Sequence, residues 1–179
     1  MKKILFIVGS TRKGSFNRQL AEVAKGLLEG KAEVSYLDFS ALPFLNQDEE
    51  YPASAELGRI RQEIKDADAL WVFTPEYNSS YPGYLKNLID WLSRPVVPND
   101  YSSPVIIGKK VAISGVAGKS AAAGARGKLR ELLTLVKAVV VEKETGGSLN
   151  REAIVSGTYT PDEATLLALQ EEAEAILSD

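Results

Sequence analysis

The chain has 179 residues, of which 45% are apolar and 25% are charged, and its net charge is −3. These values are typical of an ordinary globular protein, and we expect a single domain over residues 1–179. The sequence contains no cysteine and no histidine, which excludes disulfides, thiol nucleophiles, Ser–His triads and zinc sites of the usual kind. A redox function would therefore have to use a bound organic cofactor.

The charge pattern also limits the possible partners. No basic run or basic–aromatic stripe is present, so the sequence argues against nucleic acid as a partner. No apolar run reaches the length of a membrane span, and no signal-peptide pattern precedes the first predicted strand. We therefore expect a cytoplasmic protein that binds no membrane.

Periodicity predicts alternating strands and helices along the chain. Strands are expected at Lys2–Val8, Glu33–Leu37, Ala69–Thr74, Lys110–Gly115 and Ala138–Val141. Helices are expected at Asn17–Glu29, at Ser54–Ala67, from Pro82 onward, around Leu129–Val136, and after an N-cap at Thr160 that is followed by Pro161 and Glu163. This alternation predicts an α/β fold with a parallel sheet and crossover helices.

The segment from Gly9 to Asn17, GSTRKGSFN, follows the first predicted strand and has the composition of a phosphate-binding turn. Free N–H groups at a helix start attract anions, hydroxyls donate to phosphate oxygens, and arginine adds a charge-assisted contact. The side-chain donors are Ser10, Thr11, Arg12 and Ser15. Because the GxxxxGK[ST] and GxGxxG patterns are absent, we predict a single phosphate. The alternative is an ordinary turn in which Ser15 or Asn17 caps the helix.

Two further segments follow the third and fourth predicted strands. Pro75 to Asn78, PEYN, offers main-chain N–H groups and the ring of Tyr77 to a planar heterocycle, with an ordinary β-turn as the alternative. The small residues of GVAGKSAAAG, from Gly115, permit close approach of a flat ring, with a flexible glycine loop as the alternative. Ligands of open parallel sheets bind beyond the carboxyl ends of the strands, so we expect the three segments to share one ligand. Nothing places Glu76 against a substrate proton, and we assign it no acid–base role.

Together these segments resemble the NADPH-dependent FMN reductase family of flavodoxin-like proteins. The family pattern GSxRxxSxN is matched by Gly9, Ser10, Arg12, Ser15 and Asn17. The second pattern, PEYNxSxPGxLKNxxDW, is matched from Pro75 to Trp91. The resemblance covers nearly the whole chain. It implies a flavodoxin-like three-layer sandwich with a five-stranded parallel sheet in the order 2-1-3-4-5.

The resemblance also implies cofactors and their contacts. FMN would be bound, and NADPH or NADH would be the electron donor, without any residue that is catalytic in its own right. The FMN phosphate would be held by Ser10, Arg12, Ser15, Asn17 and the N–H of Phe16, in addition to Thr11. The isoalloxazine ring would be lined by Pro75, Glu76, Tyr77 and Asn78 and approached by Ser114 and Gly115. Family members are usually dimers or tetramers, so we expect a homodimer or homotetramer with Tyr84, Trp91 and the Phe44 loop at its interface.

Our leading hypothesis is an FMN-dependent NAD(P)H oxidoreductase that passes hydride through FMN to a small-molecule electron acceptor. The acceptor would be a quinone, an azo compound, a metal oxyanion or a flavin. A flavodoxin-type electron carrier is one alternative, although Arg12 and a net charge of only −3 disfavour it. A non-catalytic phospho-ligand binding protein is the other alternative, and the lack of an evident acid–base residue favours it.

Overall fold

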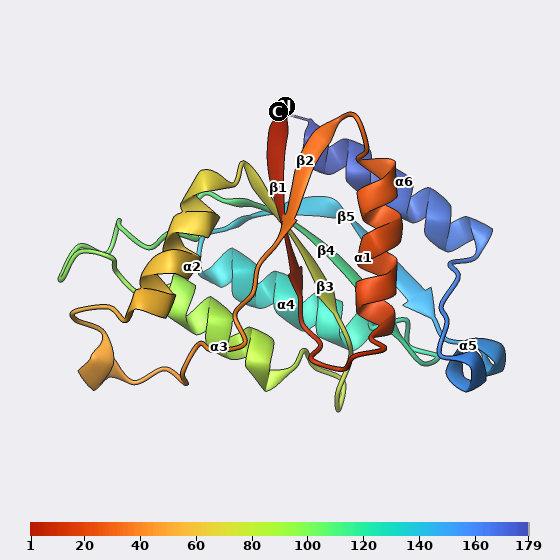
Figure 1. Cartoon of the computed structure of the whole chain (residues 1–179), viewed down its shortest axis with the longest axis horizontal. Helices are drawn as coiled ribbons and strands as arrows, with labels where there is room; N and C mark the ends of the chain where they lie inside the picture. The colour runs from red at the N-terminus through yellow and green to blue at the C-terminus, as the bar shows by residue number, and fades with distance from the viewer. Residues whose placement is uncertain (179) are drawn as a thin grey trace.

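The computed structural model describes residues 1–178, which form one five-stranded sheet (Figure 1). The strands are β1 (Lys2–Val8), β2 (Ala32–Tyr36), β3 (Ala69–Thr74), β4 (Lys110–Ala117) and β5 (Val139–Ser148). They lie in the order β2-β1-β3-β4-β5, and all neighbouring pairs are parallel. The predicted flavodoxin-like fold and its strand order are therefore confirmed.

Helices cover both faces of this sheet. They are α1 (Phe16–Leu27), α2 (Ala55–Asp66), α3 (Gly83–Leu92), α4 (Ala123–Leu135), α5 (Arg151–Ser156) and α6 (Glu163–Leu177), with a short 3-10 turn at Gln47–Glu49. α1 and α6 pack on one face, and α2, α3 and α4 pack on the other (Figure 1). A parallel sheet needs this arrangement because its strands are apolar on both sides.

β3, at the centre of the sheet, contributes to both halves of the core. All of its residues are buried. Leu70 and Val72 pack with the helices α2, α3 and α4, whereas Trp71 and Phe73 pack with α1 and α6. Burial of each such side chain stabilises the fold by about 1.5–3 kcal/mol. The alternation along β3 therefore ties the two helical layers to one strand.

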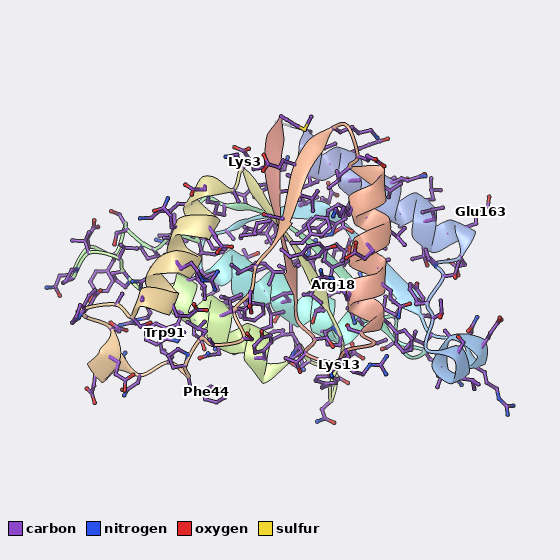
Figure 2. The ribbon with its side chains drawn as sticks, in the orientation of Figure 1. Lys3, Lys13, Arg18, Phe44, Trp91 and Glu163 are labelled. Atoms are coloured by element: carbon purple, nitrogen blue, oxygen red, sulfur yellow. The ribbon has the colours of Figure 1, made fainter. Side chains whose placement is uncertain are left out.

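The long segment between β2 and α2 is fastened to α3. Asn87 donates from its amide to the Pro43 carbonyl at 2.9 Å and accepts from the Leu45 N–H at 2.8 Å. The indole N–H of Trp91 donates to the same Pro43 carbonyl at 2.8 Å, and Trp91 is only 2% exposed. The prediction of Trp91 at a subunit interface is therefore wrong, because the chain itself buries this side chain. Phe44 is 82% exposed and points away from the ribbon (Figure 2).

The C-terminal part differs most from the prediction. β5 continues to Ser148 instead of ending at Val141, and α5 has no predicted counterpart. β5 is an edge strand, so its second half is held by pairing with β4 rather than by an apolar pattern of its own. The predicted N-cap at Thr160 is also wrong. The carboxylate of Asp162 caps α6 instead, accepting from the Thr165 N–H at 2.8 Å, since aspartate is as good a cap as threonine.

α6 carries a carboxyl group into the core. Glu172 is 0% exposed, and its Oε2 accepts from the Ser114 hydroxyl at 2.7 Å. That hydroxyl in turn accepts from the indole N–H of Trp71 at 2.9 Å. The other carboxyl oxygen, Oε1, has no hydrogen-bond partner among the described residues. Burial raises the pKa of Glu172 to about 8, so the neutral acid predominates at pH 7.

We expect Glu172 to make the stability of the protein depend on pH. Because its pKa is raised from 4.5 in the folded chain, the folded state keeps a proton that the unfolded state releases. The free energy of unfolding should therefore fall as the pH rises from about 4.5 to about 8. In Glu172→Gln this part of the slope should be missing, because glutamine does not titrate. Urea unfolding at several pH values across this range measures the difference.

Glu171→Gln is the matched control for this measurement. Glu171 is the exposed neighbour of Glu172 and pairs with Lys143 at 2.8 Å, a surface contact that contributes little to stability. This variant should keep the pH slope of the wild type. Identical slopes for the wild type and Glu172→Gln would show that Glu172 does not retain its proton.

Candidate functional site

The first loop of the candidate site connects β1 to α1. The Gly9 N–H donates to the Phe73 carbonyl at 2.9 Å, which continues the pairing of β1 with β3. Ser15 is 3% exposed and caps α1, its hydroxyl accepting from the Arg18 N–H at 3.2 Å. The first N–H groups of a helix have no partner inside it. Together with the hydroxyl of Ser10, these groups can bind an anion.

Arg12 lies in the same loop with an exposed side chain. Its guanidinium carbon is 4.5 Å from the centre of the Phe16 ring, and it donates to the Gly14 carbonyl. No carboxylate of residues 1–178 forms an ion pair with it. An arginine that lies beside a helix N-terminus and forms no ion pair can use its positive charge to bind an anion. Thr11 is exposed and does not line the cleft to which Ser10, Arg12 and Ser15 contribute.

Asn17 joins α1 to β4. Its side chain is buried, its amide donates to the Val116 carbonyl at 3.0 Å, and its carbonyl accepts from the Val116 N–H at 2.8 Å. The side chain of Asn17 thus pairs with both main-chain groups of Val116, as a residue of a neighbouring strand would. The carboxamide is therefore directed at the protein, although Asn17 also lines the cleft. The sequence indicates the residue but not this second use.

The second loop follows β3 and brings Pro75, Glu76 and Tyr77 to the cleft. Tyr77 and Ser80 exchange two main-chain hydrogen bonds of 2.9 and 3.0 Å, so the Tyr77 N–H is not the free donor that the sequence suggests. The Tyr77 side chain is 55% exposed, which leaves its ring available to a flat ligand. Asn78 has a φ of 51° at the tip of the turn and does not line the cleft.

Glu76 connects the second loop to α4. Its Oε2 accepts from the Ala125 N–H at 2.9 Å, in the first turn of that helix. Hydrogen bonds from the Ser120 hydroxyl and from the N–H groups of Ala125 and Gly124 hold the pKa of Glu76 below its usual value. A carboxylate that is ionised and already accepts from a helix N–H is a poor proton donor.

The third wall differs from the prediction, because Ser114 and Gly115 do not line the cleft. Ser114 is 0% exposed and its hydroxyl donates into the core, as described above. A Cβ on Gly115 would lie 2.7 Å from the Thr74 carbonyl oxygen and 2.7 Å from the Ala122 Cβ, so neighbours close this position. β4 continues two residues beyond its predicted end, to Ala117. The wall is therefore formed one to three residues later, by Val116, Ala117 and Gly118.

The cleft between these loops has a volume of about 270 Å³. It is lined by Ser10, Arg12, Ser15, Phe16, Asn17, Pro75, Glu76, Tyr77, Val116, Ala117, Gly118 and Leu149. Eight of the twelve predicted site residues lie here, and Thr11, Asn78, Ser114 and Gly115 do not. Leu149 follows β5 directly. The sequence interpretation misses it because it ends this strand too early.

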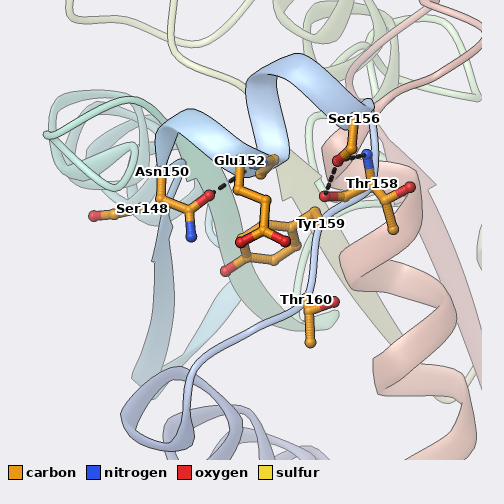
Figure 3. Close-up of a pocket in the computed structure, with 8 residues that line it drawn as sticks. Ser148, Asn150, Glu152, Ser156, Thr158, Tyr159 and Thr160 are labelled. Carbon is orange, nitrogen blue, oxygen red and sulfur yellow. Dashed lines mark hydrogen bonds between the residues drawn. The ribbon is translucent and has the colours of Figure 1, made fainter.

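Another cavity, of about 290 Å³, lies beside α5 and contains no predicted site residue (Figure 3). Its walls are mainly polar, and there the Ser156 hydroxyl accepts from the Thr158 N–H at 3.2 Å. Within residues 1–178, no three acidic side chains gather in a way that could hold a metal ion. In the same range no helix combines the length and the apolar content needed to cross a bilayer.

Comparison with known proteins agrees with this arrangement. Residues 2–148 match the family model described as NADPH-dependent FMN reductase. The quinone reductase of Escherichia coli K12 is 34% identical over 173 residues, which cover 92% of this chain and 87% of that protein. A 2-hydroxy-1,4-benzoquinone reductase of a Burkholderia species is 43% identical over 93 residues, which cover only 52% of this chain and 51% of that protein.

A solved structure is similar over the whole length. The flavoenzyme NAD(P)H:(acceptor) oxidoreductase FerB of Paracoccus denitrificans is 35% identical, with a TM-score of 0.85 over 99% of this chain and 96% of that chain. The family match and the E. coli relative both extend over most of the sequence, including the loops after β1, β3 and β4. This chain belongs to the NADPH-dependent FMN reductase family.

Proposed function

We propose that this protein is an enzyme that uses NAD(P)H and bound FMN to reduce a quinone. The family is described by its use of NADPH and FMN, and two of the relatives described above are named as quinone reductases. The observation that carries the proposal is the cleft itself. Ser10, Arg12 and Ser15 at the start of α1 and the exposed ring of Tyr77 on the second loop line the same cavity. This supports a ligand with one phosphate and one flat ring.

The phosphate of FMN fits the first loop by its chemistry. The N–H groups at the start of α1 and the hydroxyls of Ser10 and Ser15 donate, and Arg12 supplies a positive charge without an acidic partner. We propose that these groups hold the phosphate. Asn17 supports the same loop by fixing α1 to Val116.

The flat ring of FMN fits between the second loop, which follows β3, and the third loop, which connects β4 to α4. Tyr77 offers an aromatic face, and the opposite wall, from Val116 to Gly118, has small or aliphatic side chains. Leu149 adds an apolar surface at the far end of the cleft. We propose that main-chain groups of the two loops meet the polar edges of the ring, because such edges need fixed donors and acceptors.

Bound FMN supplies the redox chemistry, since flavins accept a hydride and pass its two electrons on to an acceptor. The chain contributes binding, orientation and the exclusion of water from the cleft. The sequence contains neither histidine nor cysteine, and Glu76, the one carboxylate that lines the cleft, is engaged with α4. The residues of this chain are therefore suited to holding reactants and not to moving protons.

The first test is the binding of flavin and the reduction of a quinone. Purified protein incubated with FMN and freed of excess cofactor should show flavin absorption. It should oxidise NADPH or NADH rapidly only when a benzoquinone is present, and the initial rates should follow ping-pong kinetics. Protein that stays colourless after incubation with FMN would contradict the proposal. Flavin binding without direct reduction by NADPH or NADH would indicate an electron carrier instead.

Arg12→Ala should weaken the binding of FMN by about 1.5–3 kcal/mol, the range for a hydrogen bond to a charged group. This corresponds to an increase in Kd of roughly 10- to 150-fold. Titration of the protein with FMN, followed by flavin fluorescence, measures the change. Lys13→Ala is the control, because Lys13 is an exposed neighbouring cation that does not line the cleft (Figure 2). Equal effects of the two variants would mean that Arg12 acts only through long-range charge.

We also propose that the chain forms a homodimer or homotetramer. Phe44 and Tyr101, in the segments before α2 and after α3, are 82% and 75% exposed, and large exposed aromatic side chains are common at subunit interfaces. Phe44→Asp should shift the assembly toward monomers, since a carboxylate there opposes burial. Sedimentation velocity at several protein concentrations measures the shift. A wild-type protein that sediments as a monomer at all concentrations would contradict the proposal.

A further inference from the structure

The second loop, after β3, and the third loop, between β4 and α4, both line the cleft and both contain left-handed backbone. Asn78 and Ser79 in the second loop have φ values of 51° and 57°. Ala121 and Ala122 in the third loop have φ values of 49° and 59°. Asparagine adopts this left-handed conformation readily, whereas serine and alanine do so only at a cost. Such strain persists only where the surrounding structure enforces it.

The strained segments are packed directly against each other. A Cβ placed on Gly124 would lie 3.0 Å from the Ser79 carbonyl oxygen and 3.1 Å from Glu76 Oε2. The backbone of α4 therefore approaches the second loop as closely as a glycine allows. A side chain at position 124 would therefore collide with the second loop.

α4 also lacks a cap of its own. Its N-cap residue is Ala122, which makes no side-chain hydrogen bond. The carboxylate of Glu76, from the other loop, takes this place by accepting from the Ala125 N–H at 2.9 Å. A negative charge at this end of a helix is further favoured by the partial positive charge of its N–H groups.

We infer that Glu76 is a positioning residue, whose carboxylate holds these two strained loops together and so keeps the cleft in the shape that its ligand needs. The ligand part of this inference rests on the proposed function, whereas the loop contacts do not. Glu76 and Tyr77 line the cleft from the second loop. Val116 to Gly118 line it from the end of β4 and the start of the third loop. Loss of the carboxylate should let the left-handed residues relax and the walls separate.

Hydrogen exchange of the cofactor-free protein tests the loop contacts directly. In Glu76→Ala, amide protection in residues 76–80 and 118–125 should fall at least tenfold, whereas β3 should be unaffected. Glu76→Gln keeps the shape of the side chain and one acceptor, so its loss should be smaller. Glu131→Ala is the matched control, because Glu131 is exposed on the same helix α4 and does not line the cleft.

A rescue experiment tests the role of strain. Adding Ser79→Gly and Ala121→Gly to Glu76→Ala should restore part of the lost protection, because glycine adopts a left-handed φ without strain. The affinity for FMN should fall at least tenfold in Glu76→Ala and recover in part in the triple variant. No recovery of protection in the triple variant would mean that the carboxylate does not act against backbone strain.

The two proposals can fail separately. If the wild type does not bind FMN, the proposed function fails, but the exchange data still test the contact between the loops. If the wild type binds FMN and Glu76→Ala keeps wild-type protection in both loops, the positioning role is wrong. Loss of protection throughout the chain in both Glu76→Ala and Glu76→Gln would also overturn it, since Glu76 would then support the whole fold.

Discussion

The candidate site depends on the parallel pairing of β1, β3 and β4. Their register places Val8 beside Phe73 and Phe73 beside Ser114, so the three strands end almost level and their loops leave from one edge of the sheet. A shift of one residue would turn every core side chain of a strand toward the wrong helical layer. The apolar alternation of β3, which is buried on both faces, therefore fixes the position of the site together with the core.

Strand pairing aligns the starts of the loops but does not hold their tips. Two polar side chains do this, Asn17 between α1 and β4 and Glu76 between the second loop and α4. Each left-handed serine or alanine in these loops costs about 1–2 kcal/mol, and a hydrogen bond to a charged group contributes about 1.5–3 kcal/mol. The cost of a left-handed residue and the contribution of such a hydrogen bond are similar in size. A few contacts can therefore be enough to hold the loops in this shape. Asn17 and Glu76, polar residues of the family patterns, thus stabilise the structure of the protein itself.

The fold could be predicted from the sequence because β1 and β3 are unbroken apolar runs bounded by turn residues. The loops after them carry unusual residues within a few positions, and eight of the twelve predicted site residues line one cleft. The predictions that failed concern residues whose interaction partners are distant in the sequence. The second half of β5 is held by β4, and the hydroxyl of Ser114 is directed to Glu172 on α6. Glu172 does carry one local signal, since it lies three residues after Leu169 on the apolar stripe of α6.

The position of the charged residues limits how the cleft can select a ligand. Arg12 and Glu76 are the charged residues of its lining, the former beside the anion site and the latter bound to α4. The remaining wall, around Tyr77, Val116 and Leu149, offers shape and apolar surface but few side-chain hydrogen bonds. Apolar pockets discriminate weakly between molecules of similar size, whereas unpaired buried polar groups discriminate strongly. By this argument the apolar wall selects a flat ligand mainly by its size and shape, whereas the charged end of the cleft selects by electrostatic attraction.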